Sequence, residues 1–172
     1  MSLQQLRNDR PVDVLATKLL ARAAWLAPGE PIPRDLLLAT LGSVIDEARE
    51  IPRGLSRLVR LGLLEQVGID VLRLHRLLAA FARDAVPDER AQLAVEETLA
   101  ATVDKRNREG IPLTVLPLQT HLRAVETAAA ARGSPHAAAL ANELGYHLVV
   151  TGDLAAARVY LERALADRKS VV

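Results

Sequence analysis

Aromatic side chains are scarce in a chain that is otherwise half hydrophobic. Of the 172 residues, 50% are hydrophobic, yet only Trp25, Phe81, Tyr146 and Tyr160 are aromatic. The interior must therefore be filled by Leu, Ala and Val, which favours helices packed at short distance over a β-sandwich. A chain of this length can bury roughly 70% of its unfolded surface. We expect a mostly α-helical protein with a packed core.

The charge balance argues against a protein held mainly by phosphate contacts. Lys and Arg number 22 against 21 Asp and Glu, which gives a formal charge of +1, far from a strongly basic footprint. The chain has no cysteine, so disulfides, thiol nucleophiles and Cys-ligated zinc are excluded. It contains neither a stretch of about 18 apolar residues nor the apolar segment of a secretory signal. We expect a cytoplasmic protein without a membrane partner, and the Arg-rich, Ala-rich composition suggests a bacterial genome.

The N-terminal half predicts three helices followed by a β-hairpin. Apolar residues recur every three or four positions in residues 12–26, 35–41 and 44–61, with Pro52 interrupting the third segment and Gly62 in the position of a left-handed cap. The pattern then changes to two short apolar runs, 63–67 and 71–74, around a glycine-containing loop. This order is that of a winged helix, which we assign to residues 11–86 after an N-terminal extension of residues 1–10.

The C-terminal half predicts stacked helical hairpins. Helical patterns cover residues 88–103, 117–132, 135–151 and 154–166, with breaks at Gly133-Ser134 and Gly152-Asp153. Residues 104–110 are charged and end in glycine, so we expect a loop there and the best internal boundary of the chain. Residues 87–132 are interpreted as linking helices.

The last hairpin, residues 133–166, resembles a tetratricopeptide repeat. The marks of the resemblance are Leu144-Gly145, Gly152-Asp153, Ala157 and Ala164-Leu165. Ala141 and Leu148 stand where that family usually has Trp and Tyr. In such repeats a concave surface binds a protein or peptide. The resemblance implies that Glu143, Tyr146, His147 and Val150 would form this partner groove.

Two other segments resemble bacterial STAND signalling ATPases of the NB-ARC type. They are Val71–Arg83, read with Trp25–Pro33 upstream, and the helix start at Leu116–Ala124. In that family a winged helix packs on a nucleotide-binding domain and holds it in an ADP-bound resting state, and activation leads to an oligomer. The resemblance implies that His75, in the triplet Leu74-His75-Arg76, contacts the ADP phosphate of the parent protein. A histidine that only caps the following helix is the simpler alternative.

This chain by itself is not expected to be an enzyme. It has no G-x-x-x-x-G-K-[ST] loop, and none of its three lysines follows a glycine. The four histidines show no metal spacing, and no serine has a nucleophile-elbow context. The acidic pairs Asp46-Glu47 and Glu96-Glu97 are interpreted as solvated helix faces. We therefore expect no metal and no cofactor in this chain, with ADP or ATP bound by an upstream nucleotide-binding domain of the parent.

The alternative function is a winged-helix DNA-binding regulator with a helical effector module. Arg53, Arg57 and Arg60 are spaced to share one face of the third helix, the recognition helix of such domains. Residues 43–76, however, contain six basic and five acidic side chains, so the net charge is only +1. DNA is therefore the less favoured partner, and a solvated or domain-facing arginine stripe is expected.

The end of the chain departs from the repeat pattern. Residues 167–172 read Asp-Arg-Lys-Ser-Val-Val, a peptide that the start of a common sequencing adapter can encode. We expect these six residues to be a non-native tail and the repeat pattern to stop near Ala166.

Overall fold

The computed structural model describes residues 5–7, 9–42, 50–85 and 88–170, with side chains described as far as Ala166. Its backbone packing divides the chain into two compact units, Met1–Val95 and Glu96–Val172. Most of the described residues are helical, and the remainder includes one small three-stranded antiparallel sheet. The expectation of a mostly α-helical protein is confirmed. None of the described helices combines the length and the apolar character needed to cross a membrane.

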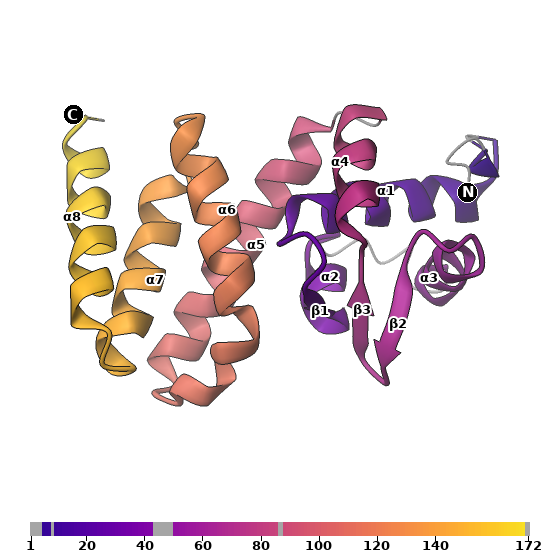
Figure 1. The fold of residues 1–172 in the computed structure, drawn as a ribbon. Helices are drawn as coiled ribbons and strands as arrows, with labels where there is room; N and C mark the ends of the chain where they lie inside the picture. Colours follow the sequence, from indigo (N-terminus) through magenta and orange to yellow (C-terminus); the bar gives the residue numbers. More distant parts are fainter. Residues whose placement is uncertain (1–4, 8, 43–49, 86–87, 171–172) are drawn as a thin grey trace. The chain divides into compact units, whose positions relative to one another are not determined.

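The first unit is built around its first helix. In chain order its elements are α1 (Pro11–Trp25), β1 (Pro31–Pro33), α2 (Arg34–Ala39), α3 (Ile51–Arg60), β2 (Glu65–Gly68), β3 (Val71–Arg73) and α4 (Arg76–Ala85) (Figure 1). Helix α1 packs against both α3 and α4. Leu19 and Leu58 are fully buried where these helices meet. The Arg83 guanidinium lies 5.6 Å from the Trp25 ring centroid and adds a cation–π contact between α4 and α1.

The sheet contains the expected hairpin and one strand that was not expected. Strands β2 and β3 pair antiparallel with an irregularity between Gln66 and Gly68, and β1 pairs on the other side of β3, Ile32 opposite Leu72. The segment Pro31-Ile32-Pro33 lies between the helices predicted at 12–26 and 35–41, and no strand was predicted there. Proline cannot donate to a ladder, so the segment is restricted to a sheet edge. Ile32 is fully buried, and the removal of its side chain from water stabilises the pairing of this segment with β3.

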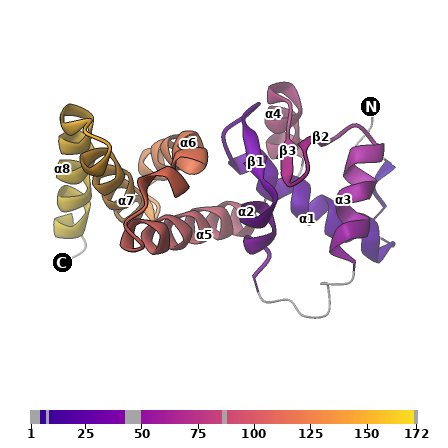
Figure 2. The same ribbon diagram turned by 90° about the horizontal axis from the view of Figure 1, so that it is seen from below.

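The second unit consists of helices packed in sequence order. Helix α5 (Glu89–Arg108) crosses the division between the units, and two short 3-10 turns (Pro112–Thr114 and Leu116–Leu118) lead to α6 (Gln119–Ala131), α7 (Ala137–Val150) and α8 (Leu154–Ser170). Helix α7 packs against both α6 and α8 (Figure 2). Gly152 makes the turn between α7 and α8 with φ +87°, a backbone conformation that glycine adopts without strain.

Two sequence-based boundaries need correction. The loop expected at residues 104–110 is wrong, because α5 continues to Arg108, whose guanidinium bonds Asp104 one turn earlier at 2.6 and 2.9 Å. Its charges therefore form a helical i,i+4 pair. Helix α8 also continues past Ala166 to Ser170. The N-terminal part of the predicted helix at 44–61, including Asp46 and Glu47, lies outside the described residues, whereas the cap at Gly62 is confirmed with φ +65°.

Candidate functional site

His75 lies between β3 and α4, with its side chain at the N-terminus of the helix. Its Nδ1 accepts a hydrogen bond from the backbone N–H of Leu77 at 3.3 Å, and its carbonyl accepts from Ala79 N–H at 2.9 Å. An imidazole nitrogen that accepts a hydrogen bond carries no proton, so the neutral ring holds its proton on Nε2. The side chain is exposed. The contact thus orients the ring and leaves Nε2–H available as a donor.

A hollow of about 430 Å³ adjoins His75. Its lining comes from the turn after α3, the hairpin and the start of α4: Gly62, Leu63, Glu65, Arg73, His75, Leu77 and Leu78. The Nε of Arg73 is buried and has no hydrogen-bond partner in the described part of the chain, and Arg73 Nη1 lies 3.7 Å from Glu65 Oε2. This hollow, the His75 hollow, therefore combines leucine walls with the Arg73–Glu65 pair and with the Nε2–H of His75, which could donate to an anion.

An apolar strip on α4 starts beside the His75 hollow. Leu77 is 75% exposed and Phe81, one turn later on the same helix face, is 53% exposed. Leu77 also lines the hollow. Large apolar side chains grouped on one surface are typical of a site for another protein or domain.

The three arginines of the DNA alternative do not act as one free stripe. Arg57 is engaged by Asp13 of α1, with Nε 2.8 Å from Oδ1, and also donates to the Gln5 carbonyl at 2.9 Å. Arg53 pairs with Glu50 at 2.8 Å. Of the three, only Arg60 has no hydrogen-bond or ion-pair partner among the described residues. Two of the three charges are therefore already compensated within the first unit.

The four residues expected in a partner groove have different environments. Tyr146 and Val150 are about half exposed, at 47% and 46%. Glu143 is half-buried and accepts hydrogen bonds from Asn107 Nδ2 at 2.8 Å and from Asn142 Nδ2 at 3.0 Å. His147 is only 1% exposed, so it lies inside the helical packing and cannot line an open groove in this unit.

The buried imidazole of His147 has no hydrogen-bond partner at either ring nitrogen in the described part of the chain. Burial lowers the pKa of His147 from its ordinary value, and the positive charge of Arg123 lowers it further. The ring is therefore held in its neutral form, as expected for a base taken out of water.

Two buried glutamates were missed at the sequence level. Glu96, expected on a solvated face with Glu97, is 1% exposed and accepts from Arg132 at 2.7 Å and from Ser134. Glu126 is fully buried and pairs with Arg163 at 2.6 Å. A signal was present for Glu96, because it shares the face of the buried Gln92, Leu99 and Val103 at helical spacing.

No group of three His, Cys, Asp or Glu side chains able to hold a metal occurs among the residues that the structure describes. No model of a known protein family matches the chain, and no curated protein or solved structure matches it. What the chain does is therefore inferred from its own residues.

Proposed function

We propose that the chain is the regulatory and protein-interaction region of a STAND signalling ATPase. In this proposal a winged helix at residues 11–86 restrains an ADP-bound nucleotide-binding module supplied by the parent protein. A tetratricopeptide-type hairpin at residues 133–166 takes part in sensing a ligand or a protein partner. The release of the restraint would shift a two-state equilibrium toward an active oligomer.

The observation that carries the proposal is the setting of His75. Its Nδ1 is occupied by the Leu77 N–H, so Nε2–H is the group left to meet a phosphate oxygen. Arg73 lines the same hollow and adds a positive charge there, with its Nη1 3.7 Å from Glu65 Oε2. A phosphate group accepts such donors strongly because it is charged. The helix-capping role considered as the simpler alternative is therefore compatible with phosphate contact through the other nitrogen.

The apolar strip of Leu77 and Phe81 supports a domain contact at the same place. A module that covers this strip would remove exposed apolar surface from water, which stabilises the association. The strip begins at the His75 hollow, so one docking event would cover the apolar side chains and bring a bound phosphate near the imidazole.

The packing of α7 on α8 supports the repeat part of the proposal. A Cβ added at Gly145 would lie 2.7 Å from Leu161 Cγ, so the absence of a side chain permits the close approach of the two helices. Tyr146 and Val150 remain exposed on α7 and are the retained candidates for partner contact. The pairing of Arg53 and Arg57 with acidic residues weighs against the DNA-binding alternative.

The decisive experiment uses the parent protein, reconstructed by sequencing the reading frame that precedes codon 1. We expect this frame to encode a P-loop module and the joined protein to keep ADP bound through purification. His75→Ala should accelerate ADP release on the order of tenfold, since one charge-assisted hydrogen bond is lost. His136→Ala, at the start of α7, is the matched control and should leave release unchanged.

Two results would contradict the proposal. One is a preceding frame without a P-loop. The other is an ADP release rate that His75→Ala does not alter. Sequence-preferring DNA binding by the 172-residue chain, weakened in Arg60→Glu and steeply dependent on salt, would instead favour the regulator alternative.

A further inference from the structure

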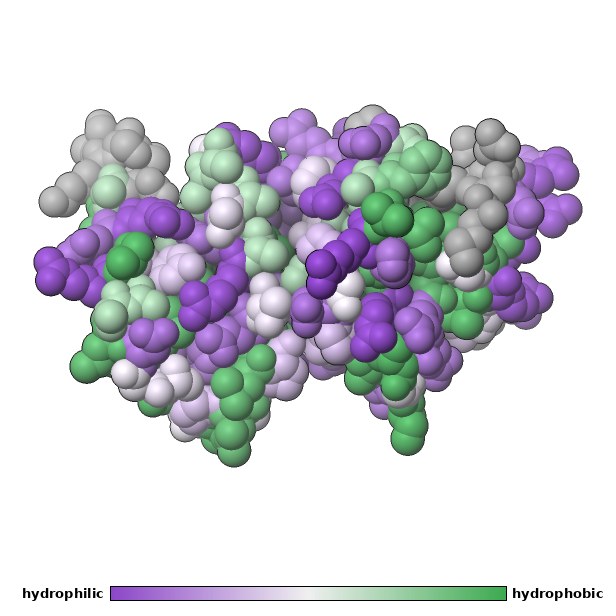
Figure 3. Space-filling view, in the orientation of Figure 1, coloured by the Kyte–Doolittle hydropathy of each residue, from purple (hydrophilic) through white to green (hydrophobic). Residues whose placement is uncertain are grey.

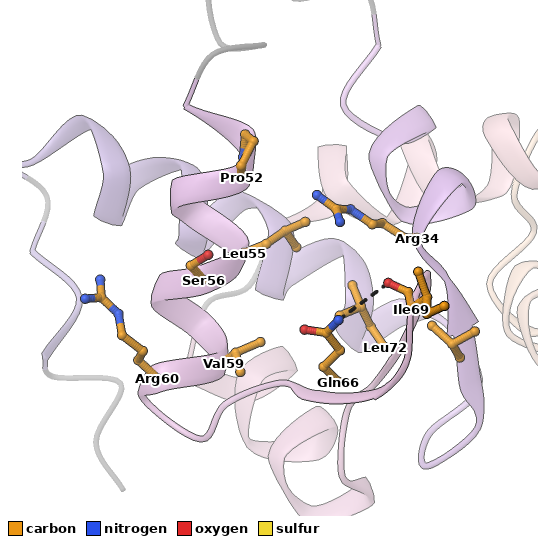
Figure 4. Close-up of a pocket in the computed structure, with 10 residues that line it drawn as sticks. Arg34, Pro52, Leu55, Ser56, Val59, Arg60, Gln66, Ile69 and Leu72 are labelled. Atoms are coloured by element: carbon orange, nitrogen blue, oxygen red, sulfur yellow. Dashed lines mark hydrogen bonds between the residues drawn. The ribbon is translucent and has the colours of Figure 1, made fainter.

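A second hollow of about 310 Å³ lies between α3 and the β2–β3 hairpin (Figure 4). It is separate in its lining from the His75 hollow. Residues from α3, the hairpin and the start of α2 line it: Arg34, Pro52, Leu55, Ser56, Val59, Arg60, Gln66, Ile69, Val71 and Leu72. Its volume is near the lower end of the range of about 300–1,000 Å³ for small-molecule pockets. The size indicates a small ligand.

The walls of this hollow are apolar on both sides. Leu55 and Val59 come from α3, and Leu72 from β3 faces them across the opening (Figure 4). Ile69, at the hairpin tip, is 89% exposed and extends one wall outward. Hydrophobic side chains project at the tip of this hairpin in Figure 3. A ligand between these walls would transfer apolar surface out of water.

The charged group at the hollow is the guanidinium of Arg34. This side chain is half-buried and has no ion-pair or hydrogen-bond partner in the described part of the chain, although its backbone N–H donates to the Asp70 carbonyl at 2.9 Å. Among the residues that the structure describes, no acidic side chain lines the hollow. Figure 4 shows Arg34 at the Pro52 end of α3, whereas the Arg60 guanidinium is directed away from the apolar walls. Within residues 5–7, 9–42, 50–85 and 88–170, Arg34 is therefore a cation without an acidic partner, beside an apolar cavity.

We propose that the hollow between α3 and the hairpin binds a small carboxylate with an apolar body. The body packs against Leu55, Val59 and Leu72, and the carboxylate accepts hydrogen bonds from Arg34, whose planar fork matches a carboxylate in bidentate geometry. A bare inorganic anion would pair with the Arg34 guanidinium but would leave the apolar walls exposed to water. A neutral apolar molecule would shield the guanidinium from water without pairing it.

The test follows backbone amides of the whole 172-residue chain by NMR while three probes are added: octanoate, 1-octanol and acetate. We expect octanoate to shift the amides of Leu55, Val59, Gln66 and Leu72. Acetate lacks the apolar body and 1-octanol lacks the charge, so each should bind at least about tenfold more weakly. Equal binding of 1-octanol, or octanoate shifts confined to Leu77 and Phe81, would overturn the proposal.

Two variants test the assignment of Arg34. Arg34→Gln should weaken octanoate binding on the order of tenfold, because the charged donor is removed. Gln66→Glu changes an exposed residue of β2 that lines the hollow, and its added carboxylate would compete for Arg34, so binding should weaken to a similar degree. Since it does not alter a buried side chain, it remains informative if Arg34→Gln fails to fold.

The matched control is Arg53→Gln, which removes the same charge from α3 outside the lining of this hollow. It should leave octanoate affinity unchanged. Equal weakening in Arg53→Gln and Arg34→Gln would show a general charge effect and contradict the assignment, as would unchanged affinity in Gln66→Glu.

Discussion

The Nε of Arg57 lies 2.8 Å from Oδ1 of Asp13, and this ion pair joins α3 to α1 across 44 positions of sequence. Asp13 is 2% exposed, and its second oxygen accepts from the backbone N–H of Arg7 at 3.2 Å. Arg57 is therefore a structural residue of the first unit. Its side chain is directed at α1, which removes it from the surface that a recognition helix would present to DNA.

Removal of the Arg57 side chain should strongly destabilise the first unit. Arg57→Ala leaves a buried carboxylate without its charged partner, and the free energy of unfolding should fall by about 3 kcal/mol. Arg53→Ala is the control, because the Arg53 side chain is 71% exposed in its pair with Glu50, and it should change stability by less than about 0.5 kcal/mol. Urea unfolding measures both variants. Equal effects would show that burial of Asp13 does not decide the strength of the pair.

The same carboxylate should contribute to acid unfolding. Burial of Asp13 acts to raise its pKa, but hydrogen bonds from Arg57 and Arg7 and the charges of Arg57 and Arg10 outweigh it, so the net pKa is lowered. The unfolded chain then binds this proton more readily than the folded chain. The stabilisation is present above the ordinary Asp value of about 3.9 and is lost as the pH falls through the folded-state pKa. The free energy of unfolding, measured between pH 7 and pH 2, should fall less steeply below about pH 4 for Asp13→Asn than for the natural chain.

Local patterns were sufficient to predict most of the elements. The spacing of Leu and Ala between proline and glycine breaks predicted helices that overlap the described ones, and the change of period near Leu63 predicted the hairpin. Both signals act over a few residues, where the sequence directly records which side chains alternate or recur. The left-handed glycines at Gly62 and Gly152 mark breaks of the same local kind.

Contacts between distant segments were not predictable in the same way. Ile32 pairs with Leu72 of β3, which lies 40 positions later in the chain, so no local pattern could predict the pairing. The prolines on either side of Ile32 also hide the strand character of its segment. Glu96 was interpreted as solvated because its partners Arg132 and Ser134 belong to a later turn. The predicted groove included His147 because helical spacing gives the face of a residue, whereas its burial depends on the neighbouring helices.

The buried imidazole of His147 should reduce stability in mild acid. Because burial and Arg123 lower its pKa, the unfolded chain binds a proton near pH 6.5 that the folded chain does not. The free energy of unfolding should therefore fall as the pH drops below about 6.5. His147→Leu should remove this part of the pH dependence. It should also maintain or raise stability at pH 7, by up to about 1 kcal/mol, because two unpartnered polar atoms are removed. An unchanged pH slope in His147→Leu would contradict this prediction.

One methyl group added at Gly145 should destabilise the packing of α7 on α8. A Cβ there would lie 2.7 Å from Cγ and 2.8 Å from Cδ2 of Leu161 on α8. Alanine gains about 1 kcal/mol in helix propensity, but overpacking costs about 1–3 kcal/mol. We expect a net loss of about 1 kcal/mol for Gly145→Ala in thermal unfolding. Adding Leu161→Ala to that variant should relieve the clash, so the two effects should be clearly non-additive. Simple additivity would exclude the contact as the cause.

The ion pair between Glu126 of α6 and Arg163 of α8 should stabilise the fold far more than the pair between Arg158 and Glu162 on α8. Arg163 Nη1 lies 2.6 Å from a fully buried Glu126 oxygen, and Arg158 Nε lies at the same 2.6 Å from Glu162, with side chains 79% and 62% exposed. Arg163→Ala should lower the free energy of unfolding by about 2 kcal/mol or more, because a buried carboxylate loses its charged partner. Arg158→Ala should leave it nearly unchanged, because both partners are exposed to water.

The variant Arg163→Lys keeps the positive charge but changes the other contacts of the side chain, so it distinguishes their contributions to stability. The Arg163 guanidinium also lies 5.4 Å from the Tyr160 ring centroid, a stacking contact that lysine reproduces less well. Lysine should therefore recover part of the stability lost in Arg163→Ala, as measured by urea unfolding. Since the two arginine pairs have the same N–O distance, a large effect at Arg163 and a small one at Arg158 would assign the difference to burial. Equal losses at both positions would contradict that assignment.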